Sequence, residues 1–391
     1  MAETRADTVI ADGGRVWIAD VADARIGADW DALLRALYAL LVSRGEKVTL
    51  DALMAHSGDA FNLCHASNWQ AAASLCVPTD TVTNAAAAFG YRAEALDSSY
   101  IPEGMDALPR DERLDVTRAA LERIYAEIDA GRPVLVGGAE EHCERWSIVV
   151  GYDREQDLLC HIGDADPYRW TPISGVTVGT ADDERGYWTG CCRGAVRDGF
   201  VGGWVCNPAF LIGERSETPP ERLEMTLSAL RRGVELHAAA KHHVDCGGGI
   251  DYFFGAEAYE QWARSLETLD YPADLHKPLP DGARGWYAMG NMGTQVDQIM
   301  RGRAAAAEFC RYATVLMRGR ADHLLAAADA YDRECAVAAE RLPAFTEGTE
   351  QNRVEWLKDA RCRREGAEAV RAMLEDENAA VADIRCAVET R

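Results

Sequence analysis

Residues 131–170 read GRPVLVGGAEEHCERWSIVVGYDREQDLLCHIGDADPYRW and contain three short apolar runs. The runs are Val134–Val136, Trp146–Val150 and Leu158–Ile162. β-branched and aromatic residues are frequent in them, as is typical of strands, and glycine, proline or aspartate lies between them, for example at Gly151–Asp153. The stretch predicts antiparallel strands joined by turns, with a polar excursion at 139–145. A helix over about 110–130 is expected to lead into it.

The pattern AGRPVLVGG, a polar loop, WSIVVGYD and then DADP resembles the second half of the papain-like cysteine peptidase superfamily. Within it, the sequence is similar to the group of butirosin biosynthesis protein H, acyltransferase homologues with a helical C-terminal domain. The resemblance implies a catalytic histidine where the strand in WSIVVGYD opens. It also implies an orienting aspartate or asparagine near the end of the third. Asp166 is present at the second position, whereas Arg145 stands at the histidine position, eight residues before Asp153.

A helix with one apolar face is expected after Asp29, which is a good N-cap, and Gly45 is a good stop. The apolar positions are Trp30, Leu33, Leu34, Leu37 and Leu41. In papain-like proteins the nucleophilic cysteine opens such a helix, where the positive end of the helix dipole lowers the thiol pKa. Matching residues 36–61, ALYALLVSRGEKVTLDALMAHSGDAF, to the family places the nucleophile at Asp31, and no cysteine precedes Cys64.

The resemblance therefore assigns Asp31, Arg145 and Asp166 to the three catalytic positions, and only the last fits the chemistry. A carboxylate would give an anhydride as its acyl product, and arginine is no general base at neutral pH. One hypothesis is that Asp31 and Arg145 form a salt bridge in the former active site. The alternative is that Asp31 only complements the helix dipole and that Arg145 is solvated on a loop.

Catalysis by relocated residues is a second possibility. Cys64 as nucleophile, His142 as base and Asp166 behind it are the candidate catalytic residues, although adjacent cysteine and histidine are also common without function. The candidate substrate-binding residues are Asp31, Asn68, Trp69, Arg145, Trp146 and Trp170. Aromatic residues gather in loops and strand ends there and could line a ligand pocket, although core filling explains most of them equally well.

Composition limits the partners. The chain has 391 residues, 48% of them hydrophobic, 27% charged, and a formal net charge of −23. Such a charge repels phosphate backbones and anionic lipid, so neither nucleic acid nor a membrane is an expected partner. It would attract a cationic substrate, although surplus acid also serves solubility. The N-terminus lacks a signal peptide pattern, so a cytoplasmic location with reduced cysteines is expected.

The rest of the chain is expected to divide into a papain-like domain over 1–213 and a helical domain over 214–391, with the boundary in ERSETPP, Glu214–Pro220. Strands are predicted at Arg15–Val21, after Gly90 and at Gly203–Ile212. From Glu221 onward the pattern is helical throughout. Five helices there suit a bundle: around Leu223–Val234, after Gly249, and at Val296–Met317, Ala321–Leu342 and Val354–Val388.

Two further clusters have competing interpretations. A zinc site could use His237, His242, His243, Asp245 and Cys246. Histidines at a helix end also satisfy carbonyls and the dipole, so capping is the alternative. The vicinal pair Cys191–Cys192 could bind a soft metal, or be two small residues in a loop. No cofactor is expected.

The predicted fold class is therefore α+β: a papain-like domain with a central helix on an antiparallel sheet, followed by an all-α domain. Two function classes remain open. The first is a cysteine-dependent acyltransferase or amidohydrolase of specialised metabolism, for which an acyl carrier protein is a conceivable donor. The second is a catalytically silent homologue that binds a small molecule or a partner protein in the former active-site cleft. Oligomerisation is compatible with either.

Overall fold

The computed structural model describes residues 9–19, 21, 32–66, 80–96, 121–137, 146–162, 168–172, 209–239, 242–244, 250–269 and 292–389. These residues form two compact units. The first takes the described residues up to Leu53 and those between Leu75 and Pro220. The second takes those between Met54 and Ser74, between Glu221 and Val244, and from Gly249 onward. The predicted domain boundary after residue 213 falls inside a strand, Ala209–Arg215.

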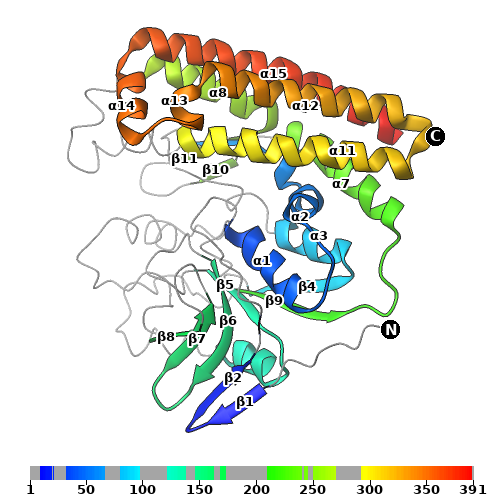
Figure 1. The fold of residues 1–391 in the computed structure, drawn as a ribbon, viewed down its shortest axis with the longest axis vertical. Coiled ribbons are helices and arrows are strands. Elements are labelled where there is room, and N and C mark those ends of the chain that lie inside the picture. Colours follow the sequence, from blue (N-terminus) through cyan, green and yellow to red (C-terminus); the bar gives the residue numbers. More distant parts are fainter. Residues whose placement is uncertain are drawn as a thin grey trace. The chain divides into compact units, whose positions relative to one another are not determined.

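The first unit contains an antiparallel sheet in the order β1-β2-β6-β5-β9-β4, with β7 paired to β6 and β8 paired to β7 (Figure 1). The strands are β1 Val9–Asp12, β2 Arg15–Ile18, β4 Tyr91–Leu96, β5 Val134–Gly137, β6 Trp146–Asp153, β7 Leu158–Ile162, β8 Arg169–Pro172 and β9 Ala209–Arg215. The three strands predicted from the central stretch are thus confirmed. Strand β1 was not predicted.

Helix α1, Ala32–Ser43, packs against β5 and β6 through leucines. Its predicted face is confirmed for Leu33, Leu34, Leu37 and Leu41, which are all buried; Trp30 lies outside the described residues. Gly45 ends the helix at φ 83°, a left-handed conformation that favours glycine. Arg44 then donates hydrogen bonds to the carbonyls of Ile212 and Gly213, which ties the helix end to β9.

The predicted turn at Gly151–Asp153 is wrong, because β6 continues through Asp153. At Gly151 the backbone of β2 passes so closely that an added Cβ would lie 2.7 Å from the Val16 carbonyl oxygen. Glycine is needed there for close strand approach, and so it does not mark a turn. The turn comes after the strand instead, where Asp153 accepts hydrogen bonds from the backbone amides of Glu155 and Gln156.

Other described helices of the first unit include α3, Asp80–Ala88, which packs on β4, and a helical segment over residues 121–129. Ile124 and Ile128 of that segment are buried, as the predicted helix before β5 requires. Helix α2, Leu50–Ser57, contains the division between the units.

The second unit is a helical bundle in which α15 packs along α12, α8 and α7, and α12 along α11 (Figure 1). Its elements are η1 Asp59–Phe61, α7 Arg222–His237, α8 Gly255–Thr268, η6 Gln298–Arg303, α11 Ala304–Leu316, η7 Arg318–Arg320, α12 Ala321–Arg341, α13 Pro343–Thr346, α14 Glu350–Lys358 and α15 Ala360–Glu389. The predicted C-terminal helical region is confirmed. The helix expected over Val354–Val388 is interrupted at Asp359, between α14 and α15.

A purely helical second unit is a wrong prediction, because the unit also holds a small sheet in the order β10-β11-β3. Its strands are β3 Cys64–Ala66, β10 His242–Val244 and β11 Ile250–Phe254, all antiparallel. Pairing between residues almost two hundred positions apart is invisible to local pattern analysis, which explains the error. None of the helices in the described ranges combines the length and apolarity needed to cross a bilayer.

Candidate functional site

Six of the predicted site residues lie outside the described part of the chain. They are Asp31, Asn68, Trp69, His142, Arg145 and Asp166. The structure does describe Cys64, Trp146 and Trp170. The predicted salt bridge between Asp31 and Arg145, and the relocated use of His142 and Asp166, therefore remain predictions. The same holds for the pair Cys191–Cys192.

The described strands establish where the chain leaves the sheet beside these positions. Gly137, the last residue of β5, is opposite Trp146, the first residue of β6. Ile148 of β6 is opposite Ile162, the last residue of β7. The end of β5, the beginning of β6 and the end of β7 thus share one edge of the sheet. Residue 145, which the resemblance to papain-like peptidases matches to a catalytic histidine, directly precedes that edge in the sequence.

Two buried polar groups at the beginning of β6 have no hydrogen-bond partner among the described residues. Trp146 is 3% exposed, and its ring packs against Phe210 with the ring centroids 5.6 Å apart. Its indole Nε1 has no hydrogen-bond partner among the described residues. The hydroxyl of the adjacent, fully buried Ser147 has none there either. Buried polar groups in proteins are almost always paired. Because Trp146 and Ser147 are successive residues of a strand, their side chains lie on opposite faces of the sheet. Each donor therefore needs its own partner from outside the described residues, such as another part of the chain, ordered water or a bound group.

Trp170 has a partner of a different kind. The Arg15 guanidinium lies 4.7 Å from the centroid of the Trp170 ring, a cation–π contact between β2 and β8. The same guanidinium lies 3.3 Å from the carboxylate of buried Asp153. Trp170 is thus engaged with the sheet's own residues.

Cys64 lies on β3 in the second unit, where it pairs with Phe254 of β11 and is 5% exposed. Its neighbour His65 follows it directly in the strand. Successive side chains of a strand point to opposite faces, so the adjacent thiol and imidazole do not form a catalytic pair.

His65 is held as a neutral imidazole. Gln295 directs its amide nitrogen to both the Cys64 carbonyl oxygen, at 3.2 Å, and His65 Nδ1, at 2.7 Å. With Nδ1 accepting this bond, Nε2 carries the ring proton and donates to Ser265 Oγ at 2.9 Å. Burial lowers the pKa of His65 to about 3, against a small opposing contribution from the Gln295 hydrogen bond. An imidazole with this tautomer and so low a pKa cannot deprotonate Ser265.

The described thiols with a shifted pKa are all shifted upward. Burial raises the pKa of Cys160, Cys310 and Cys335 to about 12 in each case. The pKa of Cys362 is also raised, by burial first and then by nearby carboxylates. A nucleophilic cysteine needs the opposite shift, so these four are unsuited to acyl transfer.

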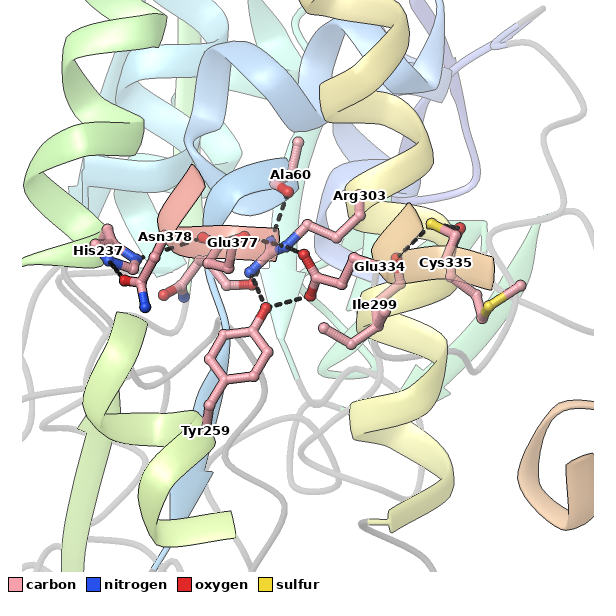
Figure 2. Close-up of polar contacts among 11 residues, drawn as sticks. Ala60, His237, Tyr259, Ile299, Arg303, Glu334, Cys335, Glu377 and Asn378 are labelled. Atoms are coloured by element: carbon pink, nitrogen blue, oxygen red, sulfur yellow. Dashed lines mark hydrogen bonds and ion pairs between the residues drawn. The ribbon is translucent and has the colours of Figure 1, made fainter. Parts of the chain in front are cut away.

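A second polar cluster, which sequence analysis missed, occupies the core of the second unit, called the helical unit below (Figure 2). It comprises Arg303 from η6, Glu334 from α12, Glu377 from α15 and Tyr259 from α8, each 0% exposed. We call these four residues the Arg303 cluster. Arg303 Nε lies 2.9 Å from Glu377 Oε2 and 3.4 Å from Glu334 Oε2. The guanidinium also donates to the Ala60 carbonyl oxygen, at 2.8 Å, and to the Tyr259 hydroxyl, at 2.8 Å.

The backbone that presents Arg303 is itself unusual. Arg303 ends a π-helix, Gln298–Arg303, and such segments often occur at functional positions. The Cys335 thiol lies 3.6 Å from the Ile299 carbonyl oxygen and donates a hydrogen bond to it. The thiol of α12 thus satisfies an acceptor of the π-helix, which joins the two elements beside the cluster.

His237 connects the cluster to the surface. Its Nε2 lies 2.9 Å from Asn378 Oδ1, and its Nδ1 lies 3.5 Å from Glu377 Oε1, with 12% of its side chain exposed. Of the other members of the predicted zinc set, His242 and His243 are described only as part of strand β10, and Asp245 and Cys246 lie outside the described residues, so the zinc site stays a prediction. Among the residues that the structure describes, no group of three or more histidine, cysteine or carboxylate side chains is placed to hold a metal.

In comparisons with known proteins, no family model and no curated sequence matches this chain. A functional assignment therefore rests on the chemistry of the two polar features, the strand end at Trp146 and the Arg303 cluster.

Proposed function

We propose that the first unit has the papain-like fold and that the chain is a cysteine-independent binding protein. The fold proposal is supported by the order of elements, since α1 precedes strands β4 to β9 of the antiparallel sheet and packs against β5 and β6. It is supported also by the strands found at WSIVVGYD and LLCHI, two of the segments that carry the resemblance.

Cysteine chemistry is disfavoured by the positions of the thiols. No cysteine precedes Cys64 in the sequence, so the family's nucleophile position holds Asp31. Cys64 belongs to β3 of the second unit, and its neighbour His65 is committed to Gln295 and Ser265. Every described thiol whose pKa is shifted has a raised pKa. An acyl-enzyme mechanism would need a lowered pKa.

The single observation that carries the binding proposal is the buried indole N–H of Trp146 at the start of β6, which has no hydrogen-bond partner among the described residues. Trp146 follows directly after Arg145, a permanent cation at the position where the family has its histidine. A buried donor next to a cation in the sequence favours a ligand that presents acceptors. We infer a small molecule with a carbonyl or carboxylate oxygen. The overall charge of −23 opposes a strongly anionic one, so a neutral or zwitterionic ligand fits best.

Replacing Trp146 with phenylalanine tests this proposal, because the change keeps an aromatic ring and removes only the indole N–H. The free protein is expected to keep its stability, since that N–H has no partner among the described residues to lose. A library of small neutral and zwitterionic carbonyl and carboxylate compounds would be screened by ligand-observed NMR. A compound that binds the native chain should bind Trp146→Phe about fivefold more weakly, because one hydrogen bond is worth about 1 kcal/mol.

The control is Trp17→Phe, a half-buried tryptophan on β2 of the same sheet, which should leave binding unchanged. Equal affinity of the native chain and Trp146→Phe for every binder would refute a site at this strand end. So would a complete lack of binders.

A further inference from the structure

The Arg303 cluster has more negative than positive side chains. Glu334 and Glu377 are two potential anions around one guanidinium, and all three side chains are fully buried. A buried carboxylate without a compensating charge costs several kcal/mol. Such a carboxylate usually binds a proton and becomes neutral instead. Some additional positive charge must therefore enter the core.

Hydrogen bonding in and beside the cluster is also incomplete: the donors Arg303 Nε and Tyr331 Oη have no hydrogen-bond partner among the described residues, although Arg303 Nε makes ion-pair contacts. Tyr259 donates its hydroxyl proton to Glu334 Oε1, and the terminal nitrogens of Arg303 donate to Tyr259 and to the Ala60 carbonyl. Glu334 Oε2 and both carboxyl oxygens of Glu377 receive no hydrogen bond from any described residue. Within the described structure they have the ion-pair contacts of Arg303 Nε and one long contact from His237. A single O–H between the two carboxyl groups would pair Glu334 Oε2 with one carboxyl oxygen of Glu377 directly.

We propose that the helical unit folds around one bound proton shared by Glu334 and Glu377, carried mainly by Glu334 as a carboxylic acid. The cluster is then neutral, with Arg303 positive, Glu377 negative and Glu334 uncharged. Glu334 accepts the hydrogen bond of Tyr259 on one oxygen and donates to Glu377 from the other. The proton makes this unit a pH-responsive element.

The asymmetry between the two glutamates supports this assignment. The pKa of Glu334 is well above its usual range, because burial and the neighbouring charge of Glu377 outweigh Arg303. Burial would likewise raise the pKa of Glu377, but Arg303 and then His237 outweigh it, so that pKa is lowered. The geometry agrees, since Arg303 Nε is 2.9 Å from Glu377 and 3.4 Å from Glu334.

The other titratable groups that face the pair leave few alternatives. From α8 there is Tyr259, and from α12 there are Tyr331 and Cys335. The pKa of each tyrosine is well above its usual range, chiefly through burial, and that of Cys335 is about 12. Cys310 of α11, beside Tyr331, likewise has its pKa raised to about 12 by burial. All four are uncharged near neutral pH.

His237 of α7 is the remaining group. Its Nδ1 is 3.5 Å from Glu377 Oε1, beyond a good hydrogen bond, while its Nε2 is engaged with Asn378. It therefore supplies no direct donor to Glu334. His237 has some solvent exposure, 12% of its side chain, whereas the four residues of the Arg303 cluster have none. The proton is therefore expected to enter and leave the cluster past His237.

The proton has a measurable consequence for stability. An unfolded chain loses the proton of Glu334 above about pH 4.3, whereas the folded unit keeps it. Stability therefore falls as pH rises from that value until the folded pKa of Glu334 is passed. One extra proton in the folded state changes the unfolding equilibrium constant about tenfold per pH unit.

The test is Glu334→Gln in the full-length chain, because glutamine reproduces the protonated acid with an N–H in place of the O–H. Stability would be measured by urea unfolding at a series of pH values. Pulsed deuterium labelling at one fixed labelling pH would follow peptides of α12 and α15, so that only this unit is reported. We expect equal stability near pH 5 and a relative gain for Glu334→Gln of about tenfold per pH unit above it. A constant difference at every pH, or a variant that fails to fold, would overturn the proposal.

The matched control is Glu377→Gln, which also removes one buried carboxylate. It deletes the closest partner of Arg303, so this variant should be less stable than Glu334→Gln at neutral pH. Equal losses in the two variants would count against the assignment of the proton to Glu334. Infrared spectra give an independent reading: at neutral pH the native chain should show a protonated carboxyl band that shifts in D2O and is missing in Glu334→Gln. Its absence from the native spectrum would also overturn the proposal.

Discussion

Replacing Arg303 with methionine is expected to destabilise the helical unit by about 3–5 kcal/mol. Methionine has a similar volume and cannot pair with Glu377, which is fully buried and would lose its closest cationic neighbour among the described residues. The Ala60 carbonyl and the Tyr259 hydroxyl would also lose their donor. The measurement is urea unfolding with deuterium labelling of α12 and α15. The loss should shrink toward acidic pH, where Glu377 can be protonated instead.

Arg311→Met is the control for this change, because Arg311 lies only a few residues away on α11 and pairs with Glu308 at 2.7 Å and with Asp332. Its side chain is 34% exposed, so the loss should be about 0–1 kcal/mol. The double variant Arg303→Met with Glu377→Gln should recover part of the stability lost in the single variant, since the buried charge is removed together with its partner. Similar losses for Arg303→Met and Arg311→Met would contradict the role of the cluster.

Trp262→Ala should destabilise the helical unit about as much as Arg303→Met does. The expected loss in the free energy of unfolding is about 3–5 kcal/mol. Trp262 on α8 is 0% exposed and lies in the same apolar core as Met292, Leu342 and Phe345. Its indole Nε1 lies 3.1 Å from the Met292 sulfur and donates to it, so the change removes both packing and a polar contact. The loss is measured by the same labelled unfolding experiment.

Tyr312→Ala on α11 serves as the control for Trp262→Ala. Tyr312 is 44% exposed and is an aromatic residue of the same unit. Its removal should cost less than about 1 kcal/mol, as surface substitutions usually do. A loss as large as that of Trp262→Ala would show that the two helix faces are assigned incorrectly.

The strands and helices that sequence analysis located correctly are those with dense local signals. The runs around Ile148 and Leu159 are short, almost continuously apolar segments bounded by turn residues, and the leucine face of α1 repeats with the helix period. Helix α7 was found as well, but its buried face agrees only in part with the apolar positions of the sequence: Leu230 is buried, Leu223 is 42% exposed, and Gly233 packs against Phe61. Small residues allow close helix packing there, and a hydrophobic count does not detect them.

The Arg303 cluster was missed because its members look ordinary in isolation. Arg303 precedes four alanines and resembles a surface arginine, and the π-helix at whose end it lies is not visible in the sequence. A signal for the glutamates does exist. Glu334 and Glu377 occupy positions on helix faces that are otherwise apolar, between Ala327 and Ala338 in the first case. A charge within an apolar stripe predicts a buried partner, but the partner itself comes from a distant segment.

Cys64 illustrates the limit of residue-level reasoning about the candidate site. Its neighbourhood in sequence, FNLCHASNWQ, offered a thiol and an imidazole side by side. The actual partners of these two residues, Phe254, Ser265 and Gln295, all come from segments far along the chain. Strand pairing with β11 therefore decides the surroundings of both side chains, and no local motif encodes that pairing.

The claim that this chain is a cysteine-independent binding protein is tested most directly by its reaction with iodoacetamide. The native chain would be labelled at neutral pH and near pH 6, and each cysteine would be followed by mass spectrometry. We expect that no thiol stands out and that labelling falls steeply at the lower pH, as it does for ordinary thiols. Fast labelling of Cys64 or Cys143 that persists near pH 6 would reveal a low-pKa thiolate. That result would contradict a cysteine-independent binding protein and favour a cysteine-dependent acyltransferase or amidohydrolase.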